Sequence, residues 1–451
     1  MFTLKPNEDS KDTRLKSSGQ PGDVSRWGFR QDQLCNTGQS QTCNGNIECQ
    51  PTCSNSRTSR IDDDQFYGNH ETQEFKEEAD LHRHYANCTK NPGHKEFINI
   101  DKFTLNHLPA NHRDQDLYDL IKAMAGLTVR VNLEKTSPNR PEFWPNTTKP
   151  YPFFKGSRSG TGMIWNVEKR IDEEYFDSLP GNRRIGTLRD GLLNMFDVHT
   201  FKQTNGQVKV SDEDYESVTD DDEDYEPAAN EYDGNEPVPH GDEDNDHVMN
   251  DDDDPNKEYT VCWCNKCQRS QSPSRVWWEL ETYTATHVVF DAIEASGTSL
   301  KLFYDRDESP KVIIDKVKVV DAKPDTDLCR LRGVTCDENV GPKLLELWQE
   351  YYDVWERVFD KYDKTRNVDR LTFIVSHPHG CPKQVSIGQW KEKQENGRQR
   401  KRFTYTTCTC PGSSGAFVHC VGFGGWWANQ LVHTGCTEQS GFNYSGIGDV
   451  V

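Results

Sequence analysis

The chain has 451 residues, of which 33% are hydrophobic, and a formal net charge of −21. This length allows about three ordinary domains, but the low apolar content favours one packed core joined to long polar segments. The charge is local, because residues 211–254 hold 21 Asp and Glu and no Lys or Arg. We expect no nucleic-acid partner and no membrane partner, the latter because no run of 18 apolar residues exists to span a bilayer.

The start of the sequence and the cysteine content favour an intracellular, cytoplasmic protein. Residues 1–14 are polar and charged and lack the apolar stretch of a signal peptide. The chain has 15 cysteines, an odd number. Without a secretion signal, this pattern favours reduced thiols over a disulfide framework.

Residues 1–112 are expected to form a polar, largely disordered N-terminal extension. Residues 1–60 are rich in Ser, Asn, Gln, Thr and Gly and have no apolar period. Residues 61–110 are mixed and are compatible with a poorly defined arm that contains short helices. Four cysteines within residues 1–60 match no common zinc spacing and are interpreted as scattered thiols: Cys35, Cys43, Cys49 and Cys53.

The folded part is expected to begin near residue 113 with a helix and two strands. Residues 127–133 alternate apolar and polar, as a half-buried strand does, and residues 160–167 would be the next strand. The helix, over residues 114–125, has four apolar side chains on one face: Leu117, Leu120, Ile121 and Met124.

A long acidic segment interrupts this domain. Blocks of like charge repel one another and stay solvated, so residues 205–257 are expected to be a disordered insertion. The simplest role for it is a solubilising spacer. The alternative is a regulatory segment that lies over the active site, or binds a basic partner through residues 211–254.

Three cysteines follow the acidic segment at close spacing. Cys262, Cys264 and Cys267 could help to hold a zinc ion, which Cys408 and Cys410 would complete. The favoured interpretation is a β-hairpin with unpaired thiols, so no metal is expected.

The second half of the chain predicts further strands and one long helix. In residues 343–362, aromatic and aliphatic side chains recur on one helical face and acidic side chains on the opposite face. We interpret residues 341–364 as a helical insertion. His377 and His379 are interpreted as part of a turn rather than as a metal site. The expected strands cover residues 276–282, 300–304, 311–320, 371–376, 384–388, 421–432 and 443–448.

The turn at residues 408–418 has the character of a nucleophilic serine loop. Its sequence is Cys-Thr-Cys-Pro-Gly-Ser-Ser-Gly-Ala-Phe-Val. Glycine permits a sharp turn in which successive backbone N–H groups face one point. The amides of Gly412 and Ser414 could then hold a substrate oxyanion beside the Ser414 hydroxyl. Such turns are more often structural, so the interpretation depends on a base and an acid elsewhere.

Two further stretches supply that base and that acid. His287 lies in an apolar, β-branched run, Thr-Ala-Thr-His-Val-Val-Phe, and Asp327 opens a short alternating strand. A serine hydroxyl becomes a useful nucleophile when a base takes its proton and an acid fixes the tautomer of that base. Asp325 and Ser413 are the neighbouring alternatives for the acid and the nucleophile.

At these residues the chain resembles the chymotrypsin-fold, or trypsin-like, serine peptidases. Residues 284–289 (Thr-Ala-Thr-His-Val-Val) are similar to the histidine motif of that family. Residues 327–331 (Asp-Leu-Cys-Arg-Leu) are similar to its aspartate motif, and residues 411–418 (Pro-Gly-Ser-Ser-Gly-Ala-Phe-Val) to its serine motif.

Two other stretches resemble HtrA-type and glutamyl-endopeptidase-type members in particular. Residues 160–165 (Gly-Thr-Gly-Met-Ile-Trp) are similar to the strand that precedes the histidine. Val-His-Thr-Gly at residues 432–435, followed by Asn-Tyr-Ser-Gly at 443–446, is similar to the strand pair after the nucleophile. The resemblance covers roughly residues 120–451.

The resemblance implies a mostly β fold with two six-stranded antiparallel β-barrels of chymotrypsin type. The peptidase domain would span residues 113–451, interrupted by the acidic insertion at 205–257 and the helical insertion at 341–364.

The resemblance also implies an activity, that of a serine endopeptidase acting on protein or peptide substrates without a cofactor. His287 would be the general base, Asp327 would orient it, and Ser414 would form the acyl-enzyme. Asp327 is preferred to Asp325 because it directly precedes the leucine of the motif, and Ser414 is preferred to Ser413 because it precedes the Gly-Ala pair.

By the same resemblance, Cys408 would lie at the floor of the substrate pocket and His433 on its wall. Neither side chain supplies the carboxylate that selects Lys or Arg. An imidazole can donate a hydrogen bond to Glu or Gln, and it favours Glu most when it is charged. We therefore expect a preference for acidic or amide side chains.

The alternative function is a catalytically inactive, peptidase-like interaction module that acts through its acidic loop. Fold does not dictate function, and large insertions are compatible with lost activity.

Overall fold

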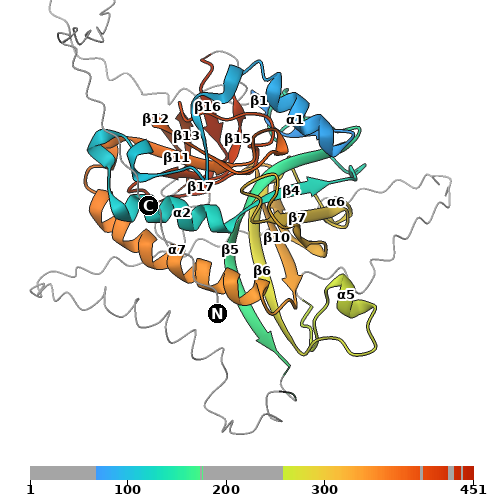
Figure 1. Ribbon diagram of the computed structural model, residues 1–451. Helices are drawn as coiled ribbons and strands as arrows, with labels where there is room; N and C mark the ends of the chain where they lie inside the picture. The colour runs from blue at the N-terminus through green and yellow to red at the C-terminus, as the bar shows by residue number, and fades with distance from the viewer. Residues whose placement is uncertain are drawn as a thin grey trace, which may run out of the picture. The chain divides into compact units, whose positions relative to one another are not determined.

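The computed structural model describes residues 68–172, 175, 257–396, 400–424, 431–437 and 440–450. The acidic insertion up to residue 256 and the four N-terminal cysteines lie outside the described residues. Within the described part, the chain forms two curled antiparallel sheets, which are flanked by a few helices (Figure 1).

The first sheet has eight strands in the order β8-β7-β4-β5-β6-β10-β9, with β2 paired to β5. Its longest strands, β5 and β6, pair along most of their length, and a register shift lies between Ile164 and Asn166. Apolar side chains of these strands, such as Val131, Ile164 and Leu280, belong to the buried core. The strands are β2 (Gln73–Phe75), β4 (Thr128–Leu133), β5 (Ser157–Ile171), β6 (Val276–Ala285), β7 (Thr298–Leu302), β8 (Val312–Ile314), β9 (Val317–Lys323) and β10 (Leu328–Thr335).

The second sheet has nine strands in the order β1-β15-β16-β13-β12-β11-β14, with β17 paired to β13 and β3 to β12. A bridge between Phe417 and Val432 connects the stretch before β14 to the stretch before β15, so this sheet curls back on itself. The strands are β1 (Asn69–His70), β3 (Phe97–Asn99), β11 (Leu371–Ser376), β12 (Gln384–Asn396), β13 (Arg400–Tyr405), β14 (Val418–Cys420), β15 (His433–Cys436), β16 (Asn443–Ser445) and β17 (Gly448–Asp449).

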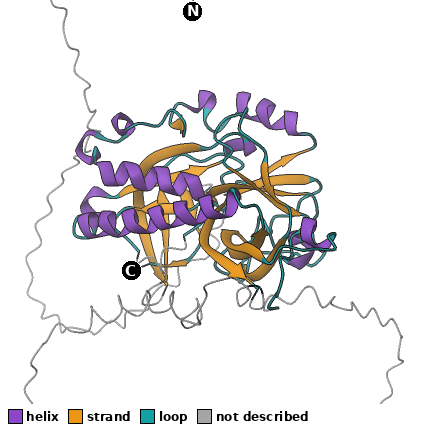
Figure 2. Cartoon of the chain, turned by 60° about the horizontal axis from the view of Figure 1, so that its bottom comes forward, coloured by secondary structure: helices purple, strands orange, loops and turns teal. Residues whose placement is uncertain are grey.

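Two long helices, α2 (Gln115–Leu127) and α7 (Val340–Tyr362), lie side by side on the outside of the sheets (Figures 1 and 2). The Asp114 side chain caps α2 by accepting a hydrogen bond from the Leu117 amide at 3.1 Å. No described helix has the length and apolar character needed to cross a bilayer. The shorter helices are α1 (Glu78–Ala86), α5 (Asn265–Gln268), α6 (Ala292–Ala295), α8 (Arg366–Asp369) and the 3-10 turns Pro92–His94, Leu105–His107, Ala110–His112 and Pro378–Gly380.

One apolar core runs through both sheets and the two long helices. Val131 and Leu280 of the first sheet, Phe373 of the second and Leu117 of α2 belong to the same buried cluster. The mostly β fold expected from the sequence is confirmed, and the helix expected at 343–362 is α7. The arrangement as two six-stranded barrels stays a prediction.

The arm of residues 68–112 differs from the expected extension. It contributes β1 and β3 to the second sheet and β2 to the first. Its helix α1 is held by Glu78, whose carboxylate pairs with the buried Arg130 guanidinium. "Largely disordered" therefore does not describe this part of residues 1–112. The polar composition misleads here because the arm gains order from backbone pairing rather than from an apolar core of its own.

A buried ion cluster fixes the first sheet beside the histidine turn. The Glu294 carboxylate accepts hydrogen bonds from Arg140 at 2.7 and 2.8 Å and pairs with Arg158 at 2.6 Å, and all three side chains are fully buried. The same guanidinium groups donate to backbone oxygens of the histidine turn, Arg140 to His287 at 3.0 Å and Arg158 to Val288 at 3.1 Å. Burial works to raise the pKa of Glu294, but the two arginines outweigh it and hold the pKa below its usual value.

Replacing Glu294 by Ala is expected to lower the free energy of unfolding by about 3–5 kcal/mol, because two buried cations lose their counterion. Urea denaturation at pH 7 measures this, with Glu346→Ala on the exposed face of α7 as the matched control. Because the pKa is lowered on folding, the contribution is present above about pH 4.3 and is lost as the pH falls through the folded value. A loss no larger than that of the control would contradict the cluster's role.

Candidate active site

Three side chains that are far apart in the sequence meet where the two sheets face each other. The His287 Nε2 atom lies 2.7 Å from the Ser414 hydroxyl oxygen, and its Nδ1 atom lies 2.8 Å from an Asp327 carboxylate oxygen. Asp327 also accepts the backbone N–H of His287 at 3.1 Å. All three are buried. The three groups thus form a hydrogen-bonded chain from hydroxyl to imidazole to carboxylate, an arrangement that activates the serine in known Ser-His-Asp hydrolases.

The Ser414 loop is anchored on β5 by Thr161. The Thr161 amide donates to the Ser414 carbonyl and the Thr161 hydroxyl donates to the Gly412 carbonyl, both at 2.8 Å. Gly412 has a φ of +99°, and a Cβ there would lie 2.4 Å from the His377 carbonyl oxygen. Glycine is therefore required at position 412, and the resulting turn directs the amides of Gly412 and Ser414 to one side of the loop.

A segment of the chain's own arm lies across this loop. The Gly412 and Ser414 amides donate to the Glu71 carbonyl oxygen at 2.6 and 3.2 Å. The Glu71 amide in turn donates to the Ser414 hydroxyl oxygen at 3.0 Å. The two amides predicted to hold an oxyanion thus hold a peptide carbonyl of the same chain.

The arm segment is extended on both sides of Glu71. On the amino side, Asn69 and His70 pair with Cys436 and Gly435 of β15. On the carboxyl side, β2 pairs with Ser157–Ser159 of β5. A Cβ on Gly435 would lie 2.2 Å from the Asn69 carbonyl oxygen, so this close approach requires glycine on β15. The segment lies across the site as a bound peptide would, joining one sheet to the other.

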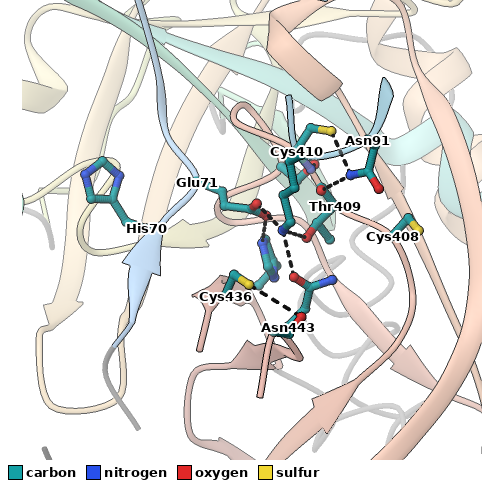
Figure 3. Close-up of polar contacts among 12 residues, drawn as sticks. His70, Glu71, Asn91, Cys408, Thr409, Cys410, Cys436 and Asn443 are labelled. Atoms are coloured by element: carbon teal, nitrogen blue, oxygen red, sulfur yellow. Dashed lines mark hydrogen bonds and ion pairs between the residues drawn. The ribbon is translucent and has the colours of Figure 1, made fainter. Parts of the chain in front are cut away.

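The Glu71 side chain enters a polar pocket of the second sheet (Figure 3). Its carboxylate accepts from His433 Nε2 at 2.6 Å and from the Lys90 ammonium. Lys90 also bonds the Thr409 hydroxyl at 3.1 Å and the Asn443 amide oxygen at 2.8 Å. Burial would raise the pKa of Glu71, but the His433 hydrogen bond and the Lys90 charge lower it to about 2.

His433 contacts this carboxylate through Nε2, and burial favours the neutral form of its imidazole. Burial lowers the pKa of His433 against the opposing effect of Glu71. The Tyr405 hydroxyl lies 2.6 Å from Nδ1, and burial raises the pKa of that hydroxyl, so it remains a donor. With Nδ1 accepting from Tyr405, Nε2 carries the proton that is donated to Glu71. The positive charge of the pocket therefore comes from Lys90.

Cys408 and the two alternatives, Asp325 and Ser413, have other neighbours. Cys408 lies apart from the Glu71 carboxylate and is half-buried among apolar neighbours (Figure 3). Asp325 is exposed, 3.6 Å from Arg400. The Ser413 hydroxyl lies 3.1 Å from that of Ser376. The preferred acid and nucleophile are thus the ones that meet His287, whereas Cys408 as the pocket floor stays a prediction.

Sequence reasoning missed Glu71 and Lys90. Both belong to the arm, whose composition is polar and whose spacing carries no motif. A lone Glu-Thr pair or a lone Lys gives no signal until backbone pairing brings the arm to the second sheet. Asn443 was noted as part of a strand motif, but its contact with Lys90 depends on the same pairing.

Two clusters of side chains have the composition of metal sites. The first cluster has four cysteine sulfurs, and the second has two cysteine sulfurs and two imidazoles. In each cluster the possible ligand atoms lie within 4.8 Å of one another. All eleven cysteines of the described part are free thiols. The first cluster is Cys262, Cys264, Cys267 and Cys336, and the second is Cys88, His94, His379 and Cys410.

The composition of both clusters differs from the sequence expectation. Cys410, which was weighed as a partner of the three close cysteines, belongs to the second cluster, and the fourth thiol of the first cluster is Cys336. Cys336 follows β10 directly and lies 69 residues after Cys267, so no local spacing indicates it.

Comparison with known proteins gives distant structural likeness alone. No protein-family model matches the sequence, and no curated protein is similar to it. Among solved structures, the HtrA-type protease AlgW with a tripeptide is 12% identical over 38% of this chain and 51% of that chain, with a TM-score of 0.23. A variant of AlgW with a decapeptide is 15% identical over 39% of this chain and 46% of that chain, with a TM-score of 0.23. This chain spans about half the length of these structures, so the case for an activity rests on the residues around Ser414.

Proposed function

We propose that this chain is a serine endopeptidase that cleaves peptide bonds on the carboxyl side of Glu. The observation that carries the proposal is the position of Glu71, with its carbonyl oxygen at the amides of Gly412 and Ser414 and its amide 3.0 Å from the hydroxyl that contacts His287. The proposed fold is a pair of chymotrypsin-type barrels within residues 113–451, completed by strands from the arm.

The proton relay follows from the distances around His287. The Ser414 hydroxyl donates to Nε2, and the Nδ1–H is held by Asp327, which fixes the tautomer and stabilises the imidazolium. When the oxygen attacks a carbonyl carbon, His287 takes the proton and passes it to the leaving amine. The amides of Gly412 and Ser414 hold the oxygen that becomes negative, an interaction that strengthens as charge develops. Water then hydrolyses the acyl-enzyme by the same route in reverse.

The preference for Glu follows from the contacts of the Glu71 carboxylate. Lys90 supplies a charge of the right sign, and His433 supplies a directed N–H from a ring that Tyr405 holds in one tautomer. The sequence-based expectation that charging of His433 sets the preference is replaced by a neutral donor beside a fixed cation. Gln in place of Glu would keep the hydrogen bond and lose the attraction to Lys90.

Protein or peptide substrates are the proposed partners. A basic partner for residues 211–254 stays a prediction, because that segment lies outside the described residues. The alternative, an inactive interaction module, would have the same fold. It differs from the peptidase in one expected result, because its Ser414 would not react.

Ser414→Ala is expected to lower kcat about 10⁶-fold, and Asp327→Asn about 10⁴-fold, by analogy with other triads.

The reaction of the full chain with a fluorophosphonate probe identifies the nucleophile directly. The Glu71→Ala chain, in which the arm loses its carboxylate anchor, should be labelled at Ser414. The same chain with Ser414→Ala should not be labelled, and Ser296→Ala on the exposed surface is the matched control. Absence of label both on Glu71→Ala and on a chain that begins at Thr72, which lacks the segment across the site, would overturn the proposed activity.

Lys90→Met is expected to lower kcat/KM for a Glu-containing peptide by roughly tenfold to a hundredfold, because a hydrogen bond to a charged group is lost. The matching Gln peptide should change much less, since no charge is lost with it. Lys95→Met, an exposed lysine five residues away, is the control. An equal effect on both peptides would show that Lys90 acts on the fold of the arm and not on the bound carboxylate.

A further inference from the structure

We propose that the Glu71–Thr72 peptide bond is this enzyme's own substrate and that Ser414 cleaves it in cis. The inference rests on the proposed peptidase function. It specifies which bond of the chain is cleaved, which fragments result and how the arm would regulate the site.

The first argument is the position of the bond itself. Three hydrogen bonds hold the Glu71 peptide against the Ser414 loop, two of them to its carbonyl oxygen and one from its amide to the nucleophile. Glu71 is 4% exposed and Thr72 6%, so the bond is enclosed rather than merely near the site. Donors about 2.7–3.1 Å from the developing oxyanion are what acyl transfer requires.

The second argument is that the arm is fixed on both sides of the bond by the fold of the same chain. Asn69 and His70 pair with β15 before the bond, and β2 pairs with β5 after it. The Gln73 side chain also contacts His379, with its amide oxygen 2.8 Å from the ring Nδ1. Since α1 and β3 then continue into the described fold, the bond reaches Ser414 without a second molecule. Cleavage should therefore be intramolecular.

The third argument is the side chain before the bond. The arm has other glutamates close by, but Glu74 is exposed on β2 and Glu78 pairs with Arg130. Of these three, Glu71 is the one whose carboxylate contacts both Lys90 and His433. The preference proposed for substrates thus selects this one bond.

The chemistry is an ordinary two-step hydrolysis. The Ser414 oxygen attacks the Glu71 carbonyl carbon, its proton moves to His287, and the bond to the Thr72 nitrogen breaks as His287 protonates that nitrogen. The Thr72 amide nitrogen donates its proton to His70 Nδ1, 3.3 Å away. Burial and the neighbouring His287 lower the pKa of His70 to about 3, which keeps this ring an acceptor. Water then hydrolyses the Glu71 ester, giving a fragment of residues 1–71 and a chain that begins at Thr72.

The two products are held to the fold very differently. Residues after Thr72 keep the pairing of β2 and β3 and the ion pair of α1. In the described part, the released fragment keeps the two-residue β1, a hydrogen bond from Gly68 to the Tyr444 hydroxyl, and the Glu71 contacts. Its departure would empty the substrate pocket while leaving Lys90 in place. Before cleavage, the arm therefore occupies the substrate site and inhibits it.

The test is the N-terminus and intact mass of the purified full chain over time. Wild type should convert to a chain beginning at Thr72, at a first-order rate that does not change with protein concentration. Ser414→Ala and Glu71→Lys should stay whole, and Glu74→Ala should be cut as wild type is. A tagged Ser414→Ala chain mixed with wild type should remain uncut, because cleavage is intramolecular.

The outcomes separate this inference from the peptidase proposal. An uncut wild type beside a Glu71→Ala chain that reacts with the fluorophosphonate at Ser414 would overturn self-cleavage and leave the peptidase in place. No cut and no label would overturn both. Cleavage at another bond, or cleavage of the tagged Ser414→Ala chain by wild type, would overturn the intramolecular assignment.

A second inference rests on separate residues: the geometry points to a structural zinc site formed by Cys262, Cys264, Cys267 and Cys336. Four sulfurs at about 2.3 Å from a tetrahedral zinc ion are about 3.8 Å apart. The Sγ atom of Cys336 lies 3.7 Å from that of Cys264 and 3.6 Å from that of Cys267.

The surroundings of these sulfurs also suit a metal. The Cys267 amide donates to the Cys264 sulfur at 3.4 Å, and the Ser274 amide donates to the Cys267 sulfur at 3.3 Å. Such N–H groups stabilise the thiolate form that binds zinc. The site would join the loop around α5 to the chain that directly follows β10.

Metal analysis of the purified full chain tests the zinc site without reference to activity. Wild type should hold one more zinc per chain than Cys336→Ser, and Cys436→Ser, another half-buried thiol, should hold as much as wild type. Cys336→Ser should also melt at a lower temperature than wild type. Equal zinc in wild type and Cys336→Ser, or an intact mass that reveals disulfides among these four cysteines, would overturn the assignment.

Discussion

The hydrogen bonds between the Ser414 loop and the Glu71 peptide are the interaction on which the functional account depends. They require a glycine with positive φ at position 412, an amide at 414 and an extended arm that passes between the sheets. Each of these features, taken alone, is compatible with a purely structural role. Together they place a peptide carbonyl, a hydroxyl and an imidazole in the order that acyl transfer uses.

The site is formed by both sheets, and its supports are buried. Thr161 of β5 holds the Ser414 loop, and the Glu294 cluster holds the backbone of the histidine turn through Arg140 and Arg158. Buried charges of this kind are costly unless they are paired, so removal of one partner would destabilise the turn. The backbone position of His287 is thus fixed by residues that lie outside the proposed triad.

Much of the central fold could be predicted from sequence because its signals are local. The stripe at 343–362 corresponds to α7, the apolar run at 371–376 is β11, and the motifs around His287, Asp327 and Ser414 indicated residues that do meet. The arm could not be predicted in this way. Its strands β1 and β2 have two and three residues, and its contacts join distant parts of the chain, as in the bond from Gly68 to Tyr444 across 376 residues. Cys336 could not be predicted for the same reason. It lies 69 residues after Cys267, so no short sequence spacing links it to the other three cysteines.

The most direct measurement is the cleavage, by the full-length Glu71→Ala chain, of a free octapeptide with the sequence of residues 68–75, Gly-Asn-His-Glu-Thr-Gln-Glu-Phe. Mass spectrometry of the products locates the cut. The account predicts cleavage on the carboxyl side of Glu, including a cut between the first Glu and Thr, and none when Ser414 is also replaced by Ala. An intact peptide, or a cut that persists without the Ser414 hydroxyl, would contradict it.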